Sequence, residues 1–319
     1  MHASRSPRAR RLLVAAVVVL APLAVLAAAR LFDPRAIRAM IDRQGRQMAK
    51  RFAPRRWQQP PPWATRADPP LATFAVIADN HYHDGGKPEW TRRTPARLLK
   101  AVRFIRDHVK PQWVLLLGDI ISVEEQPEQL RRVKQLLDKH LGIPYLAVAG
   151  NHDGPGYEKV FGASNYSVSR GGIRLVGIGI TYWHWDSGWG RYDKMAWLAA
   201  ELAAHRDEPT IVLTHNPLYM PSFVNTAAVR ELVEAQPQVL GILSGHMHVD
   251  IEVPLGKPHL GMPMLVRAPY AFKVLRVHPD RILILTYEDR DGAYRQANIY
   301  QKLDIPKRYR LGGGKAGNP

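Results

Sequence analysis

The stretch from Tyr145 to Asp153, YLAVAGNHD, decides how this sequence is interpreted. Its apolar half, Tyr145–Ala149, leads without a spacer into Gly150 and the polar side chains that follow. A short apolar run of this kind is typical of a parallel strand buried on both faces. Open α/β sheets bind their ligands at the carboxyl ends of such strands. The amide, imidazole and carboxylate of Asn151, His152 and Asp153 therefore predict a functional site rather than core packing.

Four other apolar runs end in the same kind of polar residue. Each is short and mostly aliphatic, so each predicts a buried strand. We expect all five strand ends to converge on one edge of one sheet. The four runs and the residues after them are Thr73–Ala78 before Asp79, Asn80 and His81; Trp113–Leu117 before Gly118 and Asp119; Thr210–Leu213 before Thr214 and His215; and Val239–Leu243 before Gly245, His246 and His248.

Together these blocks resemble the full motif set of the calcineurin-like metallophosphoesterase superfamily, over about residues 73–250. Five blocks in the right order are far more specific than any single motif. The pattern is similar to that of the bacterial cyclic-nucleotide phosphodiesterase-like enzymes. Purple acid phosphatases would have a Tyr after Asp119, and lipid A precursor hydrolases would have an Arg in place of His152; this chain has neither. The resemblance implies an α/β fold, a four-layer α/β/β/α sandwich, and leaves the substrate open.

The chain contains no cysteine, so any metal must be bound by nitrogen and oxygen ligands. Imidazole, carboxylate and amide ligands suit Mn, Fe or Zn. The resemblance implies two such ions about 4 Å apart that polarise a phosphoester and supply a bridging hydroxide as the nucleophile. It assigns Asp79, His81, Asp119 and His248 to one ion, and Asp119, Asn151, His215 and His246 to the other.

His152 is not among these ligands. The resemblance implies that it faces the leaving-group oxygen as a proton donor, and a ligand role is the alternative. Many relatives carry an Asp three residues after the bridging Asp119, where this chain has Ser122. If that Asp orients the histidine, its task falls here to Asp153, to Glu124 or to no residue.

Almost all of the net charge of +17 lies at the two ends of the chain. Residues 1–70 carry 14 Lys and Arg against 3 Asp, and residues 302–319 carry 5 against 1. Residues 71–301 hold 26 against 24, so the predicted phosphoesterase domain is nearly neutral. This distribution argues against nucleic acid as a partner.

Residues 1–30 are predicted to form a signal anchor or transmembrane segment. Four Arg precede the uncharged stretch Leu12–Ala29, whose 18 residues reach the lower limit for spanning a bilayer. Ala27–Ala29 is a possible cleavage site, so a removed signal peptide is the alternative to an uncleaved anchor. Arg residues flank the stretch on both sides and give no clear orientation. We expect a membrane-anchored protein with an extracytoplasmic, periplasmic domain.

Residues 31–70 are predicted to be a linker. Its first part, 34–52, has the spacing of a basic amphipathic helix for an anionic membrane surface, or of a solvated connector. Six prolines within 54–70 predict an extended spacer. The phosphoesterase domain follows at 71–301, and 302–319 reads as a disordered basic tail.

Within the domain we expect helices at 94–109, 127–141, 194–204 and 226–235, and strands at 165–169 and 173–180. Beyond His248, the alternating stretches 249–253, 264–267, 273–277 and 282–287 suggest a second sheet. Aromatic and imidazole side chains in loops either contact substrate or pack as a rim. They are Tyr82, His83, Trp183, His184, Trp185 and Trp189, of which the last four lie in the predicted loop 181–191.

The sequence thus predicts two-metal hydrolysis of a phosphomonoester or phosphodiester, small or lipid-linked, at or near a membrane. A nuclease-like relative is the first alternative, and the near-neutral domain opposes it. A non-catalytic membrane-tethered module is the second, and the complete ligand set opposes that. The oligomeric state stays open.

Overall fold

The computed structural model describes residues 43, 46–66, 68–85, 93–123, 126–184, 189–219 and 225–311. Almost all of them belong to a compact unit that spans residues 45–319. The predicted anchor 12–29, Glu124 and Trp185 lie outside these ranges. Among the described residues, no helix combines the length and apolar character needed to cross a bilayer.

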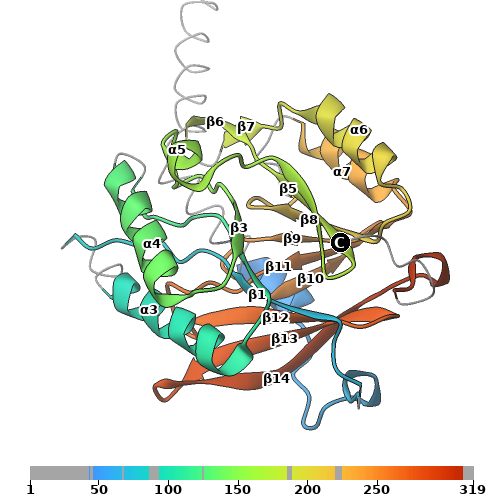
Figure 1. Ribbon diagram of the computed structural model, residues 1–319, viewed down its shortest axis with the longest axis horizontal. Coiled ribbons are helices and arrows are strands. Elements are labelled where there is room, and N and C mark those ends of the chain that lie inside the picture. The colour runs from blue at the N-terminus through green and yellow to red at the C-terminus, as the bar shows by residue number, and fades with distance from the viewer. Residues whose placement is uncertain are drawn as a thin grey trace, which may run out of the picture. The chain divides into compact units, whose positions relative to one another are not determined.

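One six-stranded sheet carries the first three apolar runs (Figure 1). Its strand order is β14-β13-β12-β1-β2-β3, in which β1, β2 and β3 are parallel and β12–β14 are antiparallel additions. The strands are β1 (Ala72–Ile77), β2 (Trp113–Leu117), β3 (Tyr145–Val148), β12 (Ala271–Val277), β13 (Arg281–Arg290) and β14 (Ala293–Asp304).

The second sheet carries the other two runs and has the order β10-β11-β9-β8-β5-β4. Its strands are β4 (Tyr166–Arg170), β5 (Ile173–Ile178), β8 (Thr210–Thr214), β9 (Val239–Ser244), β10 (Ile251–Pro254) and β11 (Pro258–Gly261). A separate two-stranded hairpin is formed by β6 (Thr181–His184) and β7 (Trp189–Arg191), where the sequence predicted only a loop.

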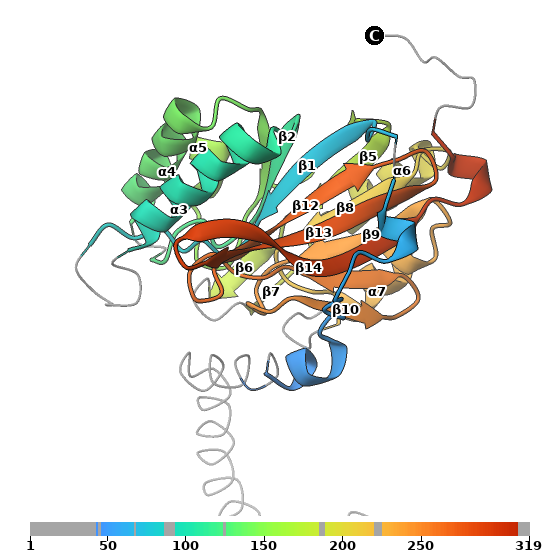
Figure 2. The ribbon, with the colours of Figure 1, turned by 90° about the horizontal axis from the view of Figure 1, so that it is seen from below.

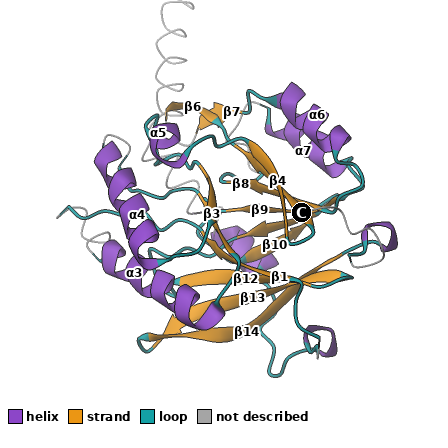
Figure 3. Ribbon diagram, viewed as in Figure 1, coloured by secondary structure: helices purple, strands orange, loops and turns teal. Residues whose placement is uncertain are grey.

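Helices cover the outer face of each sheet (Figures 2 and 3). The first sheet is covered by α3 (Thr94–Phe104), which continues as the π-helical turn Ile105–Val109, by α4 (Pro127–His140) and by the short α5 (Tyr157–Phe161). The second is covered by α6 (Met195–Ala204) and α7 (Thr226–Glu234). The four longer helices lie where the sequence predicted them.

Alternating residues of the central strands face different cores. In β1, Ala75 and Ile77 pack toward α3 and α4, whereas Phe74 and Val76 pack into the core between the sheets. A third cluster joins the second sheet to α6 and α7. Because both faces are buried, the strands read as continuous apolar runs. Three cores between four layers make an α/β/β/α sandwich, so the predicted fold is confirmed.

Two details of the predicted topology are wrong. The five apolar runs do not share one sheet, because β8 and β9 belong to the second sheet. The stretches after His248 do not form a sheet of their own: β10 and β11 extend the second sheet, and β12–β14 extend the first. An apolar run shows burial on both faces but not which neighbour it pairs with, and this is why the sequence could not separate the sheets.

The strand predicted at 264–267 is also absent. Prolines at 263 and 269 flank this segment and cannot donate to a strand ladder. It is a loop in which the Leu265 N–H donates to the Ala78 carbonyl at 3.3 Å, and the strand falls instead at Pro258–Gly261.

Residues just before β1 and just after β14 pack against the domain. The proline-rich segment runs along β14, where the Trp57 N–H donates to the Asn298 carbonyl at 2.8 Å. The predicted tail is ordered through Leu311, since β14 continues to Asp304 and a 3-10 turn follows. Ile305 and Tyr309 reach the core between the sheets, which explains why this basic stretch folds against the domain.

Tyr309 tests whether this segment contributes to stability. Tyr309→Ala removes a buried aromatic ring, so we expect the free energy of unfolding to fall by about 3 kcal/mol. Lys307→Ala, an exposed position in the same turn, should change it little. Denaturant titration of both variants measures this, and equal stabilities would show that the segment is only loosely attached.

Candidate functional site

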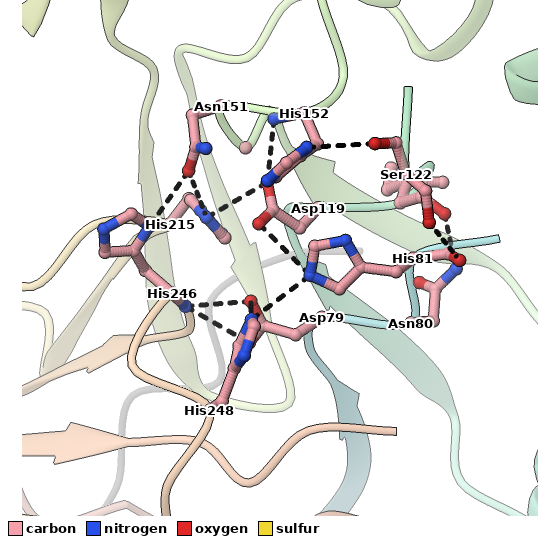
Figure 4. Close-up of polar contacts among 12 residues, drawn as sticks. Asp79, Asn80, His81, Asp119, Ser122, Asn151, His152, His215, His246 and His248 are labelled. Atoms are coloured by element: carbon pink, nitrogen blue, oxygen red, sulfur yellow. Dashed lines mark hydrogen bonds and ion pairs between the residues drawn. The ribbon is translucent and has the colours of Figure 1, made fainter. Parts of the chain in front are cut away.

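The predicted site residues follow strands of both sheets and meet where these strands end (Figure 4). The first sheet contributes residues after β1, β2 and β3, and the second contributes residues after β8 and β9. The site therefore lies between two sheets rather than along one edge. The residues it brings together are Asp79, His81, Asp119, Asn151, His152, His215, His246 and His248.

Five of these residues have a left-handed backbone, in which a side chain is normally unfavourable. Asp and His tolerate this region better than most residues, yet each instance costs roughly 1–3 kcal/mol. Such conformations persist only where the surrounding structure enforces them, and they cluster at functional sites. Their φ angles are 52° at Asp79, 42° at His81, 48° at Asp119, 66° at His246 and 58° at His248.

Two glycines allow the strand ends to approach one another. A Cβ atom on Gly150 would overlap the backbone nitrogen and Oδ1 of Asp119. Gly118 has a φ of 78°, and a Cβ there would lie 2.5 Å from Nδ1 of His215. The glycines before Asp119 and Asn151 are therefore needed for close approach and not merely for flexibility.

Asp79, His81, Asp119 and His248 form the first cluster, with one ligand atom from each within 4.8 Å of the others. Nε2 of His248 lies 3.2 Å from Nε2 of His81 and 3.3 Å from Oδ1 of Asp79. Nε2 of His81 lies 3.4 Å from Oδ2 of Asp119. Nitrogen and oxygen atoms of this number and type fit a divalent transition metal.

Asp119 also belongs to a second cluster, with His215 and His246, and Asn151 lies beside these two histidines. Its other oxygen, Oδ1, lies 3.2 Å from Nε2 of His215. Oδ1 of Asn151 is 3.2 Å from the same nitrogen and 2.9 Å from Nδ1 of His246. Asp119 thus presents one carboxylate oxygen to each cluster, the arrangement required of a bridging ligand.

The protonation states of these groups suit metal binding. Burial holds the pKa values of His81 and His246 well below the usual range, so both rings are neutral. Burial by itself raises the pKa of Asp119. The neighbouring imidazoles, above all His215, outweigh burial and hold this pKa well below its usual range. Neutral imidazole and ionised carboxylate are the ligating forms.

His215 is oriented and charged by its surroundings. Its Nδ1–H donates to the Leu117 carbonyl at 2.7 Å, which directs Nε2 toward the cluster. Burial lowers the pKa of His215, but the Asp119 carboxylate outweighs burial and raises it to about 9. A cation bound beside Asp119 would take the place of this proton.

His152 lies at the rim of the clusters. Its backbone N–H donates to Oδ1 of Asp119 at 2.9 Å, and its ring is 4.9 Å from that of His81. Its Nδ1 is 3.1 Å from the backbone carbonyl of Ser122. A main-chain oxygen therefore orients this ring, an option the sequence did not suggest.

Asp153 has a different task, which the sequence analysis missed. Its oxygens accept hydrogen bonds from the backbone N–H groups of Ile120 at 2.7 Å, Ile121 at 3.0 Å and Gly150 at 2.7 Å. Burial and the nearby Asp119 raise its pKa to about 7, against the lowering effect of the amide donors. Asp153 thus ties the turn after β2 to the turn after β3.

Two predicted substrate contacts pack instead of facing the site. Tyr82 lies in the core beneath α3 and α4, and the buried His83 has its Nδ1 3.0 Å from Nε2 of Gln129. Both fit the alternative of a packed rim. The side chains of Trp183, His184 and Trp189 lie outside the described part of the structure.

The fold and the two clusters define a metal-dependent phosphoesterase. Residues 72–250 match the family of calcineurin-like phosphoesterases, and the chain belongs to that family. The family implies divalent metal ions, for which the clusters supply a fitting set of donors. The roles of the individual ligands remain predictions.

Three relatives are similar to the chain in sequence. It is 28% identical over 206 residues to the uncharacterised protein YvnB of Bacillus subtilis, covering 56% of this chain and 15% of that protein. It is 28% identical to a probable cyclic nucleotide phosphodiesterase of Synechococcus sp., covering 43% of this chain and 58% of that protein. It is 27% identical to the glycerophosphodiester phosphodiesterase GpdQ of Enterobacter lignolyticus, covering 44% of this chain and 56% of that protein. The chain therefore spans little more than half of these two relatives.

The similarity of the fold extends further than that of the sequence. The crystal structure of a dimetal phosphatase from Danio rerio aligns with a TM-score of 0.59 at 18% identity. The alignment covers 74% of this chain and 99% of that structure.

Asp153→Asn tests the tie between the two turns. The amide cannot accept from all three N–H groups, so we expect a loss of about 1–3 kcal/mol in the free energy of unfolding. Asp84→Asn, in a more exposed ion pair with Arg132, should cost less than about 1 kcal/mol. Urea unfolding distinguishes the two, and an Asp153 variant as stable as the Asp84 variant would contradict this role.

Proposed function

We propose that this protein hydrolyses a small-molecule phosphodiester with two divalent metal ions. The observation that carries the proposal is the Asp119 carboxylate, which directs one oxygen into each of two imidazole and carboxylate clusters. The names of two relatives, a probable cyclic nucleotide phosphodiesterase and a glycerophosphodiester phosphodiesterase, favour a diester over a monoester. Asp79, His81 and His248 would hold one ion with Asp119, and Asn151, His215 and His246 would hold the other.

Metal ions bound at these positions would polarise the phosphoryl oxygens and make a water-derived nucleophile available near neutral pH. Mn, Fe or Zn would suit the donors. The chain's own residues hold and orient the ligands: the Leu117 carbonyl fixes His215, and Asp153 fixes the turns that carry Asp119 and Asn151.

His152 is the residue we propose for proton transfer. The Ser122 carbonyl accepts from its Nδ1–H, so a protonated ring would offer its second proton, on Nε2, to the leaving oxygen. Its position beside Asp119 and its ring contact with His81 place it next to both clusters.

Membrane attachment is a further part of the proposal. It rests on the uncharged stretch 12–29 and the basic residues around it. We propose with it that the domain lies outside the cytoplasm. Carbonate extraction of cell membranes and protease protection of spheroplasts would test attachment and sidedness in turn. A lipid-linked phosphoester would then be a possible substrate class.

Paired variants separate metal binding from proton transfer. Asp119→Asn weakens the shared ligand, so we expect loss of bound metal and of hydrolysis of bis-p-nitrophenyl phosphate. His152→Ala should retain both ions while the turnover rate falls about 10²- to 10⁴-fold, the range for loss of a general acid. Metal content by mass spectrometry and steady-state rates after adding back Mn, Fe or Zn measure both effects.

The same assay includes its own controls. Chelation should abolish the wild-type rate, and a higher rate on the diester than on p-nitrophenyl phosphate would support a phosphodiesterase. An Asp119→Asn variant with wild-type activity would contradict the bridging role. Activity that requires polynucleotides and falls steeply with salt would favour the nuclease alternative.

A further inference from the structure

A fully buried lysine lies in the first sheet close to the site. Lys273 is in the middle of β12 with 0% exposure. Its Nζ lies 2.7 Å from Oδ1 of Asp250, donates to Oγ1 of Thr286 at 3.2 Å, and donates to Oε1 of Gln301. The ammonium thus has two hydrogen-bond acceptors and one carboxylate as an ion-pair partner. Burying an ammonium group costs several kcal/mol before such partners compensate.

These contacts connect the two sheets. Lys273, Thr286 and Gln301 belong to β12, β13 and β14 of the first sheet, whereas Asp250 directly precedes β10 of the second. Oδ2 of Asp250 also accepts from Oγ1 of Thr286 at 2.8 Å. A second link runs from Nε2 of Gln301 to Oε2 of Glu252 in β10, at 3.0 Å. The network is therefore a polar clamp between the sheets, separate from the polar contacts among the site residues.

The clamp ends beside the candidate metal ligands. Asp250 is two residues after His248, and Lys273 is paired in register with Val76, three residues before Asp79. Asp79 itself accepts the backbone N–H of His246, with N–O distances of 3.0 and 3.2 Å. The turn that carries His246 and His248 is thus held to the first sheet on both sides.

We propose that Lys273 is a positioning residue for the metal centre, acting through Asp250 on the turn from His246 to His248. The inference rests on the proposed two-metal function. The first cluster combines His248 of the second sheet with Asp79, His81 and Asp119 of the first, so its geometry depends on how the sheets are aligned. An ammonium held by an ion pair and two hydrogen bonds constrains direction and distance, whereas apolar contacts are non-directional.

If Lys273 only stabilised the fold, metal affinity would follow stability in variants of the Lys273–Asp250 pair. Replacing a buried ion pair by uncharged groups of similar size is often neutral or stabilising, whereas removing one partner leaves a costly unpaired charge. Lys273→Met should therefore destabilise the fold. The double variant Lys273→Met/Asp250→Asn removes both charges and should recover much of that stability. If the clamp positions the ligands, metal affinity should not recover with stability.

The experiment measures Co²⁺ binding by competition with a chromophoric chelator, together with thermal unfolding of the metal-free proteins. We expect the double variant to unfold near the wild-type temperature but to bind one of two Co²⁺ ions at least tenfold more weakly, as for outer-shell changes at metal sites. The visible spectrum of the bound Co²⁺ should change as well. Arg174→Met/Glu208→Gln is the matched control, because that ion pair lies at the start of β5 and β8, at the opposite end from His215.

Each result has a distinct meaning. Unchanged Co²⁺ affinities and spectrum in the double variant would overturn the positioning role while leaving the proposed function intact. Weakened affinity in the control variant as well would also overturn it, because any lost ion pair would then suffice. Failure of the wild-type protein to bind two Co²⁺ ions would overturn the proposed function, and this inference with it.

Discussion

The arrangement of the site depends on one buried carboxylate. Asp119 is 2% exposed, and an ionised group in that position needs compensating partners on every side. They come from both sheets: His81 on one oxygen, and His215 and the His152 N–H on the other. The site can form only where the ends of β2 and β8 meet, and this requires the two sheets to face each other with their carboxyl ends aligned.

The close approach of these strand ends requires an unfavourable backbone conformation at several site residues. Five site residues have a left-handed backbone, and the glycines before Asp119 and Asn151 leave no room for a Cβ atom. The three cores, built from ordinary aliphatic packing, provide the stability that sustains this strain. Alternate residues of each central strand thus pack into two different cores, and only the residues at the strand ends are polar.

The sequence predicted much of this because strand ends and polar blocks coincide. Buried runs before Asp79, Asp119 and His215 located the strands, and the helices followed from their apolar spacing. The division into two sheets was not predictable, since a strand buried on both faces carries no mark of its neighbours. The partner of His152 was missed for another reason: it is the backbone carbonyl of Ser122, and every residue has one.

The support for the site also lies outside the segment that carries its motifs. The family match ends at residue 250, yet β12 returns from beyond it to pair with β1, the strand that leads into Asp79. This pairing places Lys273 against Asp250, and β13 and β14 add Thr286 and Gln301 to the same cluster. The motif residues specify which atoms can bind metal. The C-terminal strands determine how firmly the second sheet presents its histidines to the first.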